Sequence, residues 1–276
     1  MADSGMNVAF DVHDFALQHT LCCGQFFRYV QLDNAYYVHS RDKLFKIQQT
    51  GTRLDVIGSS HHFVSSLFDL EQDYTPILKA LATDAALRPL VAQLPGIRIM
   101  NQDPWECLIG FVCSAASNIK RIQQNMNALA EQFGQPIALD GFSSFTFPKP
   151  GAIDNPRALK LCRLGFREKY VQHINDCVTD AWLKRLRHKN YDDAKQALME
   201  LPGVGEKIAD CVLLFSLGFR QAFPVDVWIK RVVEELYFDS KPVAEKNIAA
   251  FGRERFGMNA GLAQQYLFHW RRNGSL

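Results

Sequence analysis

The sequence predicts an α+β protein in which a small antiparallel sheet precedes a mostly helical part. Short, partly alternating apolar segments separated by turn residues fill the region before residue 60, and helical spacing of apolar residues dominates after Pro95-Gly96. A chain of 276 residues with 47% hydrophobic composition can form two cores. We therefore place two domains at residues 1–95 and 96–276.

The predicted sheet comes from four segments rich in aromatic and branched residues. These strands span residues 25–32, 36–40, 43–49 and 53–58. Asp33-Asn34, Asp42 and Gly51 supply the turns between them. A helical stretch over residues 65–82 then leads out of the sheet.

The second part has clear helix signals. Pro104 fits the first position of a helix that runs through Phe111. Residues 118–133 carry apolar side chains at three- and four-residue spacing, which predicts a second helix. Residues 134–156 are rich in Gly, Pro and Ser and predict a loop.

A glycine hairpin, Leu201-Pro202-Gly203-Val204-Gly205, runs directly into an apolar helix. Gly203 and Gly205 place no side chain between the backbone and a ligand, so successive N–H groups at the helix N-terminus can bind a phosphate. The helix continues through Phe215, and Gly218 fits the position just past its end. The hairpin therefore predicts a phosphate-binding site.

Lys207, at the mouth of this helix, is a candidate nucleophile. The helix dipole and burial both favour its neutral amine, and a neutral amine attacks carbon. Asp226 precedes an apolar helical pattern over residues 227–233, so it occupies an N-cap position. Taken singly, the lysine is ordinarily solvated and the aspartate ordinarily only a cap.

Composition limits the class of protein. The net charge is only +2, but residues 157–189 hold nine Lys or Arg against three acidic residues, which fits either a nucleic-acid surface or a solvated helical face. The seven cysteines have no paired spacing, and no signal peptide or long apolar run is present. We expect an intracellular protein with reduced thiols and no membrane contact.

The hairpin followed by Pro224-Val225-Asp226 resembles the helix-hairpin-helix DNA glycosylases, and in particular the 8-oxoguanine DNA glycosylases. The resemblance extends over nearly the whole chain. Its further motifs are Cys22-Cys23-Gly24-Gln25-Phe26-Phe27-Arg28, Gln102-Asp103-Pro104-Trp105-Glu106-Cys107 and Gly261-Leu262-Ala263-Gln264-Gln265-Tyr266-Leu267-Phe268. By this resemblance the sheet domain is TATA-binding-protein-like and the helical domain is the glycosylase core.

The resemblance makes Lys207 and Asp226 the catalytic pair. The enzyme would flip 8-oxoguanine out of duplex DNA, excise it through a lysine Schiff base, and cut the strand by β-elimination. No cofactor is required. Because no cysteine follows Cys211, the iron–sulfur cluster of some relatives is excluded.

The resemblance also implies a base pocket. The carbonyl of Gly24 would accept a hydrogen bond from N7–H, which 8-oxoguanine has and guanine lacks. Cys211 and Phe268 would sandwich the base, and Gln264 would read its Watson–Crick edge. Considered alone, Gly24 is a turn residue and the other three are ordinary core or surface residues.

On the opposite strand, Arg121 and Arg167 match arginines that hold the orphaned cytosine, and Phe166 stands where a tyrosine wedges beside it. Ala116 replaces the asparagine that fills the gap left by the flipped base, so the preference for cytosine should survive but loosen. Trp228 replaces a phosphate-binding histidine, and its indole N–H is still a donor. This favours a bacterial-type member.

The hairpin carbonyls of Met199, Leu201 and Val204 would hold a structural cation in this family. We expect a monomer that acts on DNA in a bacterial nucleoid or a eukaryotic nucleus. Two alternatives stay open: a helix-hairpin-helix glycosylase for another damaged base, and a DNA-binding protein that uses the hairpin without chemistry.

Overall fold

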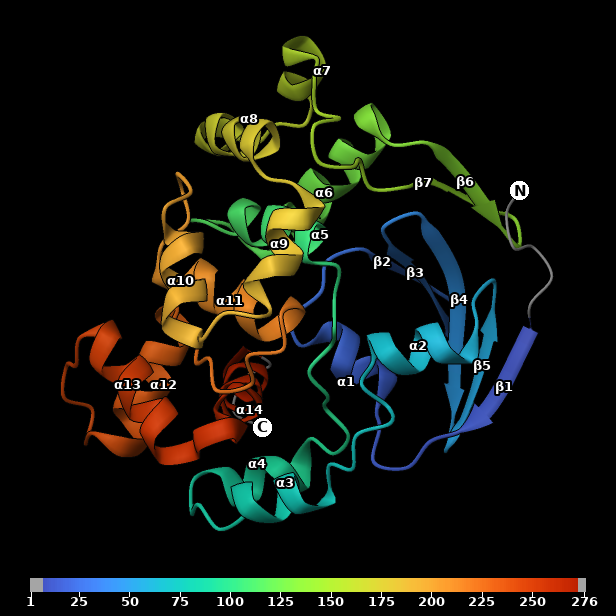
Figure 1. Cartoon of the computed structure of the whole chain (residues 1–276). Helices are drawn as coiled ribbons and strands as arrows, with labels where there is room; N and C mark the ends of the chain where they lie inside the picture. The colour runs from blue at the N-terminus through green and yellow to red at the C-terminus, as the bar shows by residue number, and fades with distance from the viewer. Residues whose placement is uncertain (1–6, 273–276) are drawn as a thin grey trace.

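The computed structural model describes residues 7–272 and confirms the predicted α+β architecture. A five-stranded antiparallel sheet has the order β1-β5-β4-β3-β2. Its strands are β1 Asn7–Asp11, β2 Tyr29–Leu32, β3 Ala35–Ser40, β4 Lys43–Thr50 and β5 Arg53–Ile57. Helices α1 (Leu17–Cys22) and α2 (His61–Leu67) share an apolar core with this sheet, and all lie to one side of the molecule (Figure 1).

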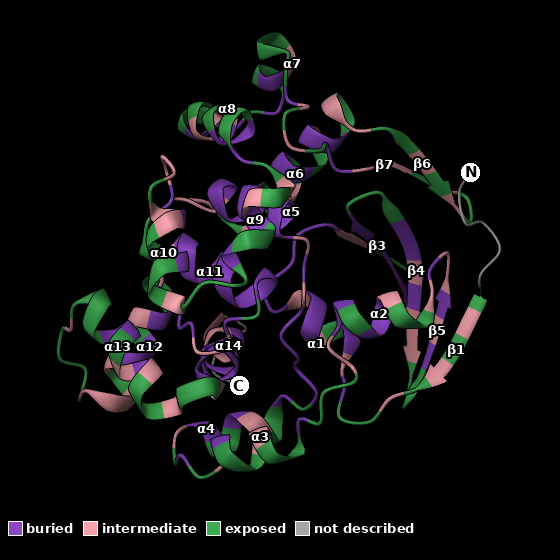
Figure 2. Cartoon of the chain, viewed as in Figure 1, coloured by how far each residue is buried: buried purple, intermediate pink, exposed green. Residues whose placement is uncertain are grey.

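The rest of the chain is largely helical and forms a second, larger core. Its helices are α3 Thr75–Leu81, α4 Leu87–Gln93, α5 Pro104–Cys113, α6 Ile119–Phe133, α7 Pro156–Leu161, α8 Glu168–Cys177, α9 Asp180–Leu186, α10 Tyr191–Met199, α11 Glu206–Ser216, α12 Val227–Tyr237, α13 Glu245–Phe256 and α14 Ala260–Arg272. Helix α11 is buried along almost its whole length (Figure 2). Within residues 7–272, no helix is both long and apolar enough to cross a membrane.

The helix boundaries predicted at Pro104, at residue 118 and at Gly218 are confirmed, and two of them are side-chain caps. The side chain of Asp103 accepts a hydrogen bond from Glu106 N, with Pro104 next to it, and α5 extends two residues past the expected end. Asn118 caps α6 through Arg121 N. Gly218 has the left-handed φ of +84° that a residue just past a helix end adopts.

The structure corrects the predicted elements in four places, the first of which is β1, a fifth strand that the sequence did not predict. The strand predicted at 25–32 begins only at Tyr29, because the buried Gln25 side chain bonds to the backbone of Arg98 and Met100 instead. The helix predicted at 65–82 is two helices, α2 and α3, interrupted near Asp69, whose φ is +55°. The loop predicted at 134–156 contains a hairpin of β6 (Pro136–Leu139) and β7 (Phe142–Phe145).

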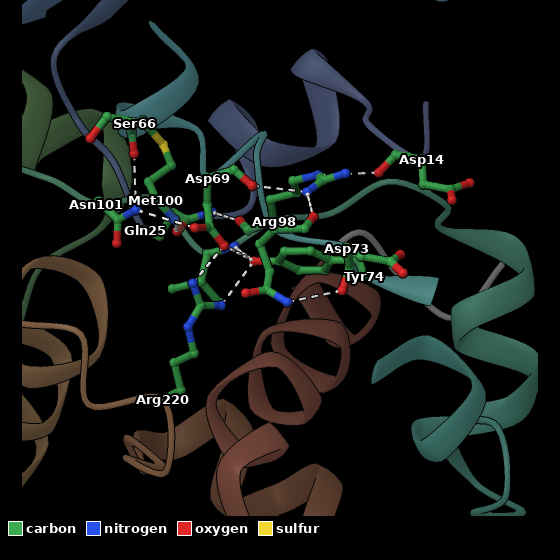
Figure 3. Close-up of polar contacts among 12 residues, drawn as sticks. Asp14, Gln25, Ser66, Asp69, Asp73, Tyr74, Arg98, Met100, Asn101 and Arg220 are labelled. Carbon is green, nitrogen blue, oxygen red and sulfur yellow. Dashed lines mark hydrogen bonds and ion pairs between the residues drawn. The ribbon is translucent and has the colours of Figure 1, made fainter. Parts of the chain in front are cut away.

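A polar network joins the sheet side of the molecule to the helical core (Figure 3). The Arg98 guanidinium lies 4.3 Å from the centre of the Tyr74 ring and donates to the carbonyls of Asp69 and Gln72. Arg220 donates to the Asp69 carboxylate (2.5 Å) and to the Tyr74 hydroxyl (3.2 Å). Arg220 lies between α11 and Asp226, so this network fixes the loop that connects the two candidate catalytic residues.

A buried ion pair forms a second link. Glu106 of α5 lies 3.4 Å from Arg28 Nε, and its other oxygen accepts a hydrogen bond from Arg41 N. Burial raises the pKa of Glu106 from 4.5 to about 7, against the opposing charge of Arg28. Because burial dominates, the carboxylate form is the costly one at this position.

We expect a Glu106→Gln variant to lose part of the pH dependence of stability. The pKa of Glu106 is higher in the folded chain, so its contribution is fully present below about pH 4.5 and lost as pH rises through about 7. The free energy of unfolding of Glu106→Gln, relative to the unchanged protein, should rise by about 3 kcal/mol over this range. Denaturant unfolding of both proteins at pH 4.5 and 7.5 measures this; a constant difference would contradict it.

Candidate active site

The hairpin between α10 and α11 has the geometry that its glycines predict. Gly203 has a φ of +83°, and a methyl group added there would lie 2.5 Å from the Tyr170 ring. Gly205 is the N-cap of α11, is exposed, and has open space where a side chain would be. Gly203 is therefore required by the fold, whereas Gly205 leaves the helix N-terminus accessible to a phosphate.

Lys207 lies in the first turn of α11 and is partly buried. Its amine donates a hydrogen bond to Ser114 Oγ at 3.1 Å and lies 5.0 Å from the centre of the Phe111 ring. No acidic side chain among residues 7–272 forms an ion pair with this amine. The amine is therefore held by a neutral partner and can be redirected toward a substrate.

Asp226 is the N-cap of α12, as the sequence predicts. Its Oδ1 accepts hydrogen bonds from Trp228 N at 3.0 Å and Ile229 N at 2.8 Å. Both bonds use the same oxygen, so Oδ2 is available to a ligand. The cap fixes the orientation of the carboxylate in the absence of a substrate.

Lys207 and Asp226 line the same cavity, which has a volume of about 600 Å³. Three more of the predicted residues, Ala116, Gly205 and Trp228, line it as well. The cavity is bordered by the end of α5, the start of α11, the start of α12 and the start of α13. Residues from segments far apart in the sequence therefore place one amine and one carboxylate in a single site.

Ser114 is a residue of this site that the sequence did not single out. It ends α5, lines the cavity, and donates its own hydroxyl hydrogen to the Phe111 carbonyl at 2.6 Å. Its oxygen is consequently an acceptor toward the Lys207 amine. A serine at a helix C-terminus gives no sequence signal for such a contact.

We expect Ser114→Ala to slow Schiff base formation about tenfold or more, because a misplaced nucleophile loses much of its effective concentration. Single-turnover borohydride trapping on duplex with an abasic site measures this rate. The matched control is Ser117→Ala: Ser117 lines the same cavity, and its hydroxyl oxygen has no hydrogen-bond partner among residues 7–272. Equal rates for the two variants would contradict the role of Ser114.

Gly24 lies in a tight turn after α1, with a φ of +85°. The carbonyls around it are occupied: Cys22 O accepts from Arg272, Cys23 O from Gln265 and Gln25 O from Gln102. The Gly24 carbonyl has no hydrogen-bond donor in the described part of the chain. It is therefore the acceptor in this turn that a ligand can use.

None of the four predicted base-pocket residues, Gly24, Cys211, Gln264 and Phe268, lines the cavity that Lys207 and Asp226 share. Phe268 packs on Gly24, since a methyl group added there would lie 2.8 Å from Phe268 Cε1. Gln264 is buried, and its Oε1 has no hydrogen-bond partner among residues 7–272. Burial raises the pKa of Cys211 to about 12, although Lys207 acts in the opposite direction, so its thiol is neutral.

Of the residues predicted to face the opposite strand, Ala116 lines the cavity, whereas Arg121, Phe166 and Arg167 do not. Phe166 is exposed, as a wedge must be. Arg121 donates to the Arg163 carbonyl at 2.9 Å and keeps an exposed side chain. Arg167 is buried and donates to the carbonyls of Ala115 and Ala116. In this structure Arg167 therefore supports the loop that holds Ala116, whose φ is +47°.

Comparison with known proteins identifies the family. Residues 7–108 match the N-terminal domain family of 8-oxoguanine DNA glycosylases. A probable N-glycosylase/DNA lyase of Methanothermobacter thermautotrophicus is 30% identical over 233 residues, which is 76% of this chain and 73% of the relative. The N-glycosylase/DNA lyase of Saccharomyces cerevisiae is 32% identical over 226 residues, which is 68% of this chain and 60% of the relative.

A solved structure of a relative has the same fold. The 8-oxoguanine glycosylase/lyase of Clostridium acetobutylicum, bound to double-stranded DNA with cytosine opposite 8-oxoguanine, superimposes with a TM-score of 0.92 at 32% identity. The alignment covers 99% of this chain and 100% of that one. The motifs, the fold and the shared cavity of Lys207 and Asp226 thus coincide with these similarities, and the chain belongs to the 8-oxoguanine DNA glycosylase family of N-glycosylase/DNA lyases.

Proposed function

We propose that this chain excises 8-oxoguanine from duplex DNA and cuts the strand at the resulting site. The placement of the Lys207 amine and the Asp226 carboxylate on one cavity carries this proposal. The Clostridium acetobutylicum relative, which is bound to DNA with cytosine opposite 8-oxoguanine, supports the substrate and the paired base. The exposed Gly205 at the start of α11 supports binding of the strand through a phosphate.

The chemistry begins at C1′ of the damaged nucleotide. As the C1′–N9 bond breaks, its electron pair stays with the base and positive charge builds on the sugar, where the Asp226 carboxylate stabilises it. The Lys207 nitrogen forms a bond to C1′, and the C1′–O4′ bond then breaks. The lone pair of the nitrogen makes the C1′=N bond of a Schiff base, and O4′ leaves as the C4′ hydroxyl with a proton that the amine gives up. Removal of a C2′ proton then expels the 3′ phosphate, and this β-elimination cuts the strand.

Selection of the lesion rests on the Gly24 carbonyl. This acceptor pairs with N7–H of 8-oxoguanine, whereas guanine presents a lone pair at N7 and leaves the carbonyl without a donor. Cys211 and Phe268 would hold the two faces of the base, and the Gln264 amide its Watson–Crick edge. The free oxygen of Gln264 fits this role because a buried unpaired acceptor is costly until a donor arrives.

On the opposite strand, Ala116 would leave the orphaned cytosine without the partner that asparagine provides in the family. Asparagine also tolerates a left-handed φ better than alanine does. We therefore expect Ala116→Asn to raise the ratio of excision opposite cytosine to excision opposite adenine about tenfold, the value of one hydrogen bond. Single-turnover rates on the two duplexes measure the ratio; an unchanged ratio would remove Ala116 from opposite-base selection.

The same proposal includes a monomeric enzyme that works where the DNA is, in a nucleoid or a nucleus. It includes a structural cation held by the carbonyls of Met199, Leu201 and Val204 beside the hairpin. Thermal unfolding in potassium, sodium and magnesium salts at equal ionic strength tests the cation, because a bound ion raises the unfolding temperature with its concentration.

The decisive experiment is excision and borohydride trapping on a panel of lesions, each placed opposite each of the four bases. We expect 8-oxoguanine opposite cytosine to be processed fastest. If thymine glycol or an alkylated base were processed faster, the enzyme would be a helix-hairpin-helix glycosylase for another lesion. If all duplexes were bound and none trapped, the chain would be a DNA-binding protein without this chemistry.

A further inference from the structure

One side of α14 carries Gln264, Phe268 and Arg272 at intervals of four residues, so all three lie on one face of the helix. Helix α14 lies next to α1 (Figure 1), where His19 and His269 are 3.2 Å apart. The first two residues of the face belong to the predicted base pocket. Arg272 was not among the sequence candidates, yet it continues the same face by one turn.

One nitrogen of the Arg272 guanidinium donates a hydrogen bond, and another has no partner among residues 7–272. Its Nη2 donates to the Cys22 carbonyl at 2.5 Å. Its Nη1 is buried and has no hydrogen-bond partner among residues 7–272. A buried donor without a partner is uncommon in folded proteins, because it loses its bonds to water and gains none.

This unpaired nitrogen, Arg272 Nη1, lies next to Gly24. A methyl group added to Gly24 would be 3.1 Å from Arg272 Nη1, closer than ordinary van der Waals contact. The same turn holds the free Gly24 carbonyl. A buried cationic donor, Arg272 Nη1, and a free acceptor, the Gly24 carbonyl, thus belong to the same small region. A ligand that carries a carbonyl group next to an N–H group could bond to both.

We propose that Arg272 is a specificity-determining residue that donates a hydrogen bond from Nη1 to the C8 carbonyl of the flipped base. This inference rests on the proposed function. In 8-oxoguanine, N7–H and the C8 oxygen are neighbours, so a base bound to the Gly24 carbonyl brings that oxygen to the Arg272 side. Gln264 and Arg272 are about 12 Å apart along α14 at 1.5 Å per residue, so they fit opposite edges of one purine.

The contact strengthens during the reaction. When the C1′–N9 bond breaks, the electron pair stays with the base, and its negative charge spreads onto the carbonyl oxygens. A guanidinium beside the C8 oxygen therefore stabilises the departing base more than the bound one. The contact affects base release, and it has no counterpart at an abasic site, where the base is already gone.

Arg272→Lys and Arg272→Gln test this with Arg271→Gln as the matched control, because Arg271 pairs instead with Glu235 at 3.1 Å. Single-turnover excision of 8-oxoguanine opposite cytosine should fall about tenfold to a hundredfold in both Arg272 variants, the effect of one charge-assisted hydrogen bond. Trapping on abasic duplex and the unfolding temperature should stay close to those of the unchanged protein. Arg271→Gln should match that protein in all three measurements.

Arg272→Lys separates base contact from a purely structural anchor. The three N–H donors of lysine share one nitrogen, and when this nitrogen takes the position of Nη2 at the Cys22 carbonyl no nitrogen is left at the position of Nη1. Excision within twofold of the unchanged protein would therefore overturn the proposal. A parallel fall in abasic-site trapping would overturn it too, because the whole site would then be displaced. A duplex with 8-thioguanine, which keeps N7–H but has a poor acceptor at C8, adds a second readout: the preference for oxygen over sulfur should shrink in Arg272→Lys. If the unchanged protein did not excise 8-oxoguanine at all, the proposed function would fail instead.

Discussion

Replacing Lys207 with glutamine is expected to abolish the covalent adduct with 8-oxoguanine duplex under borohydride and to reduce strand cutting by at least about a thousandfold. The reason is chemical, since an amide nitrogen cannot form a Schiff base. The structure favours this amine, because Lys207 lines the cavity from the first turn of α11 and is held by Ser114. Denaturing gels of trapped complexes measure the adduct directly.

Lys246 provides the matched control for this experiment. It lines the same cavity from the start of α13 and is exposed. Lys246→Gln should therefore still form the adduct, although binding of the strand can weaken. If Lys207→Gln formed the adduct and Lys246→Gln did not, the nucleophile would be Lys246, and the mechanism would have to be rebuilt around α13.

Local sequence rules predicted the parts of this site that depend on neighbouring residues. The N-cap at Asp226 follows from a carboxylate placed before an apolar helical run, and Gly218 follows from the end of an apolar helix. The helix start at Asp103-Pro104 is of the same kind. Each of these signals lies within a few residues of the feature it determines, and each is confirmed.

The sequence did not reveal contacts between distant segments. Ser114 and Lys207 are 93 positions apart, and Arg272 meets the Cys22 carbonyl across 250 positions. Neither pair has a spacing rule, because the packing of helices far apart in the sequence sets both distances. The β6–β7 hairpin is different: Asp140-Gly141, with φ values of +49° and +80°, is a strong hairpin turn signal that the surrounding Gly, Pro and Ser residues obscured.

The largest effect on base excision after loss of the nucleophile is expected at Asp226. Because its carboxylate caps α12 through Oδ1, an alanine variant would lose about 1 kcal/mol of stability along with the charge. Asparagine caps as well as aspartate, so Asp226→Asn removes the charge and keeps the fold. The unfolding temperature of Asp226→Asn should therefore stay close to that of the unchanged protein.

Excision of 8-oxoguanine by Asp226→Asn should slow about a hundredfold to a thousandfold, as when one preorganised electrostatic group is lost from a transition state. Schiff base formation and strand cutting at a preformed abasic site should slow much less. The positive charge on the sugar ring that the carboxylate stabilises forms only while the base leaves. Glu245, which lines the same cavity, supplies the control: Glu245→Gln removes an equal charge and should excise at nearly the unchanged rate. Equal losses in the two variants would mean that the cavity needs negative charge in general. A loss confined to Asp226 ties the effect to the one carboxylate that the start of α12 holds in place.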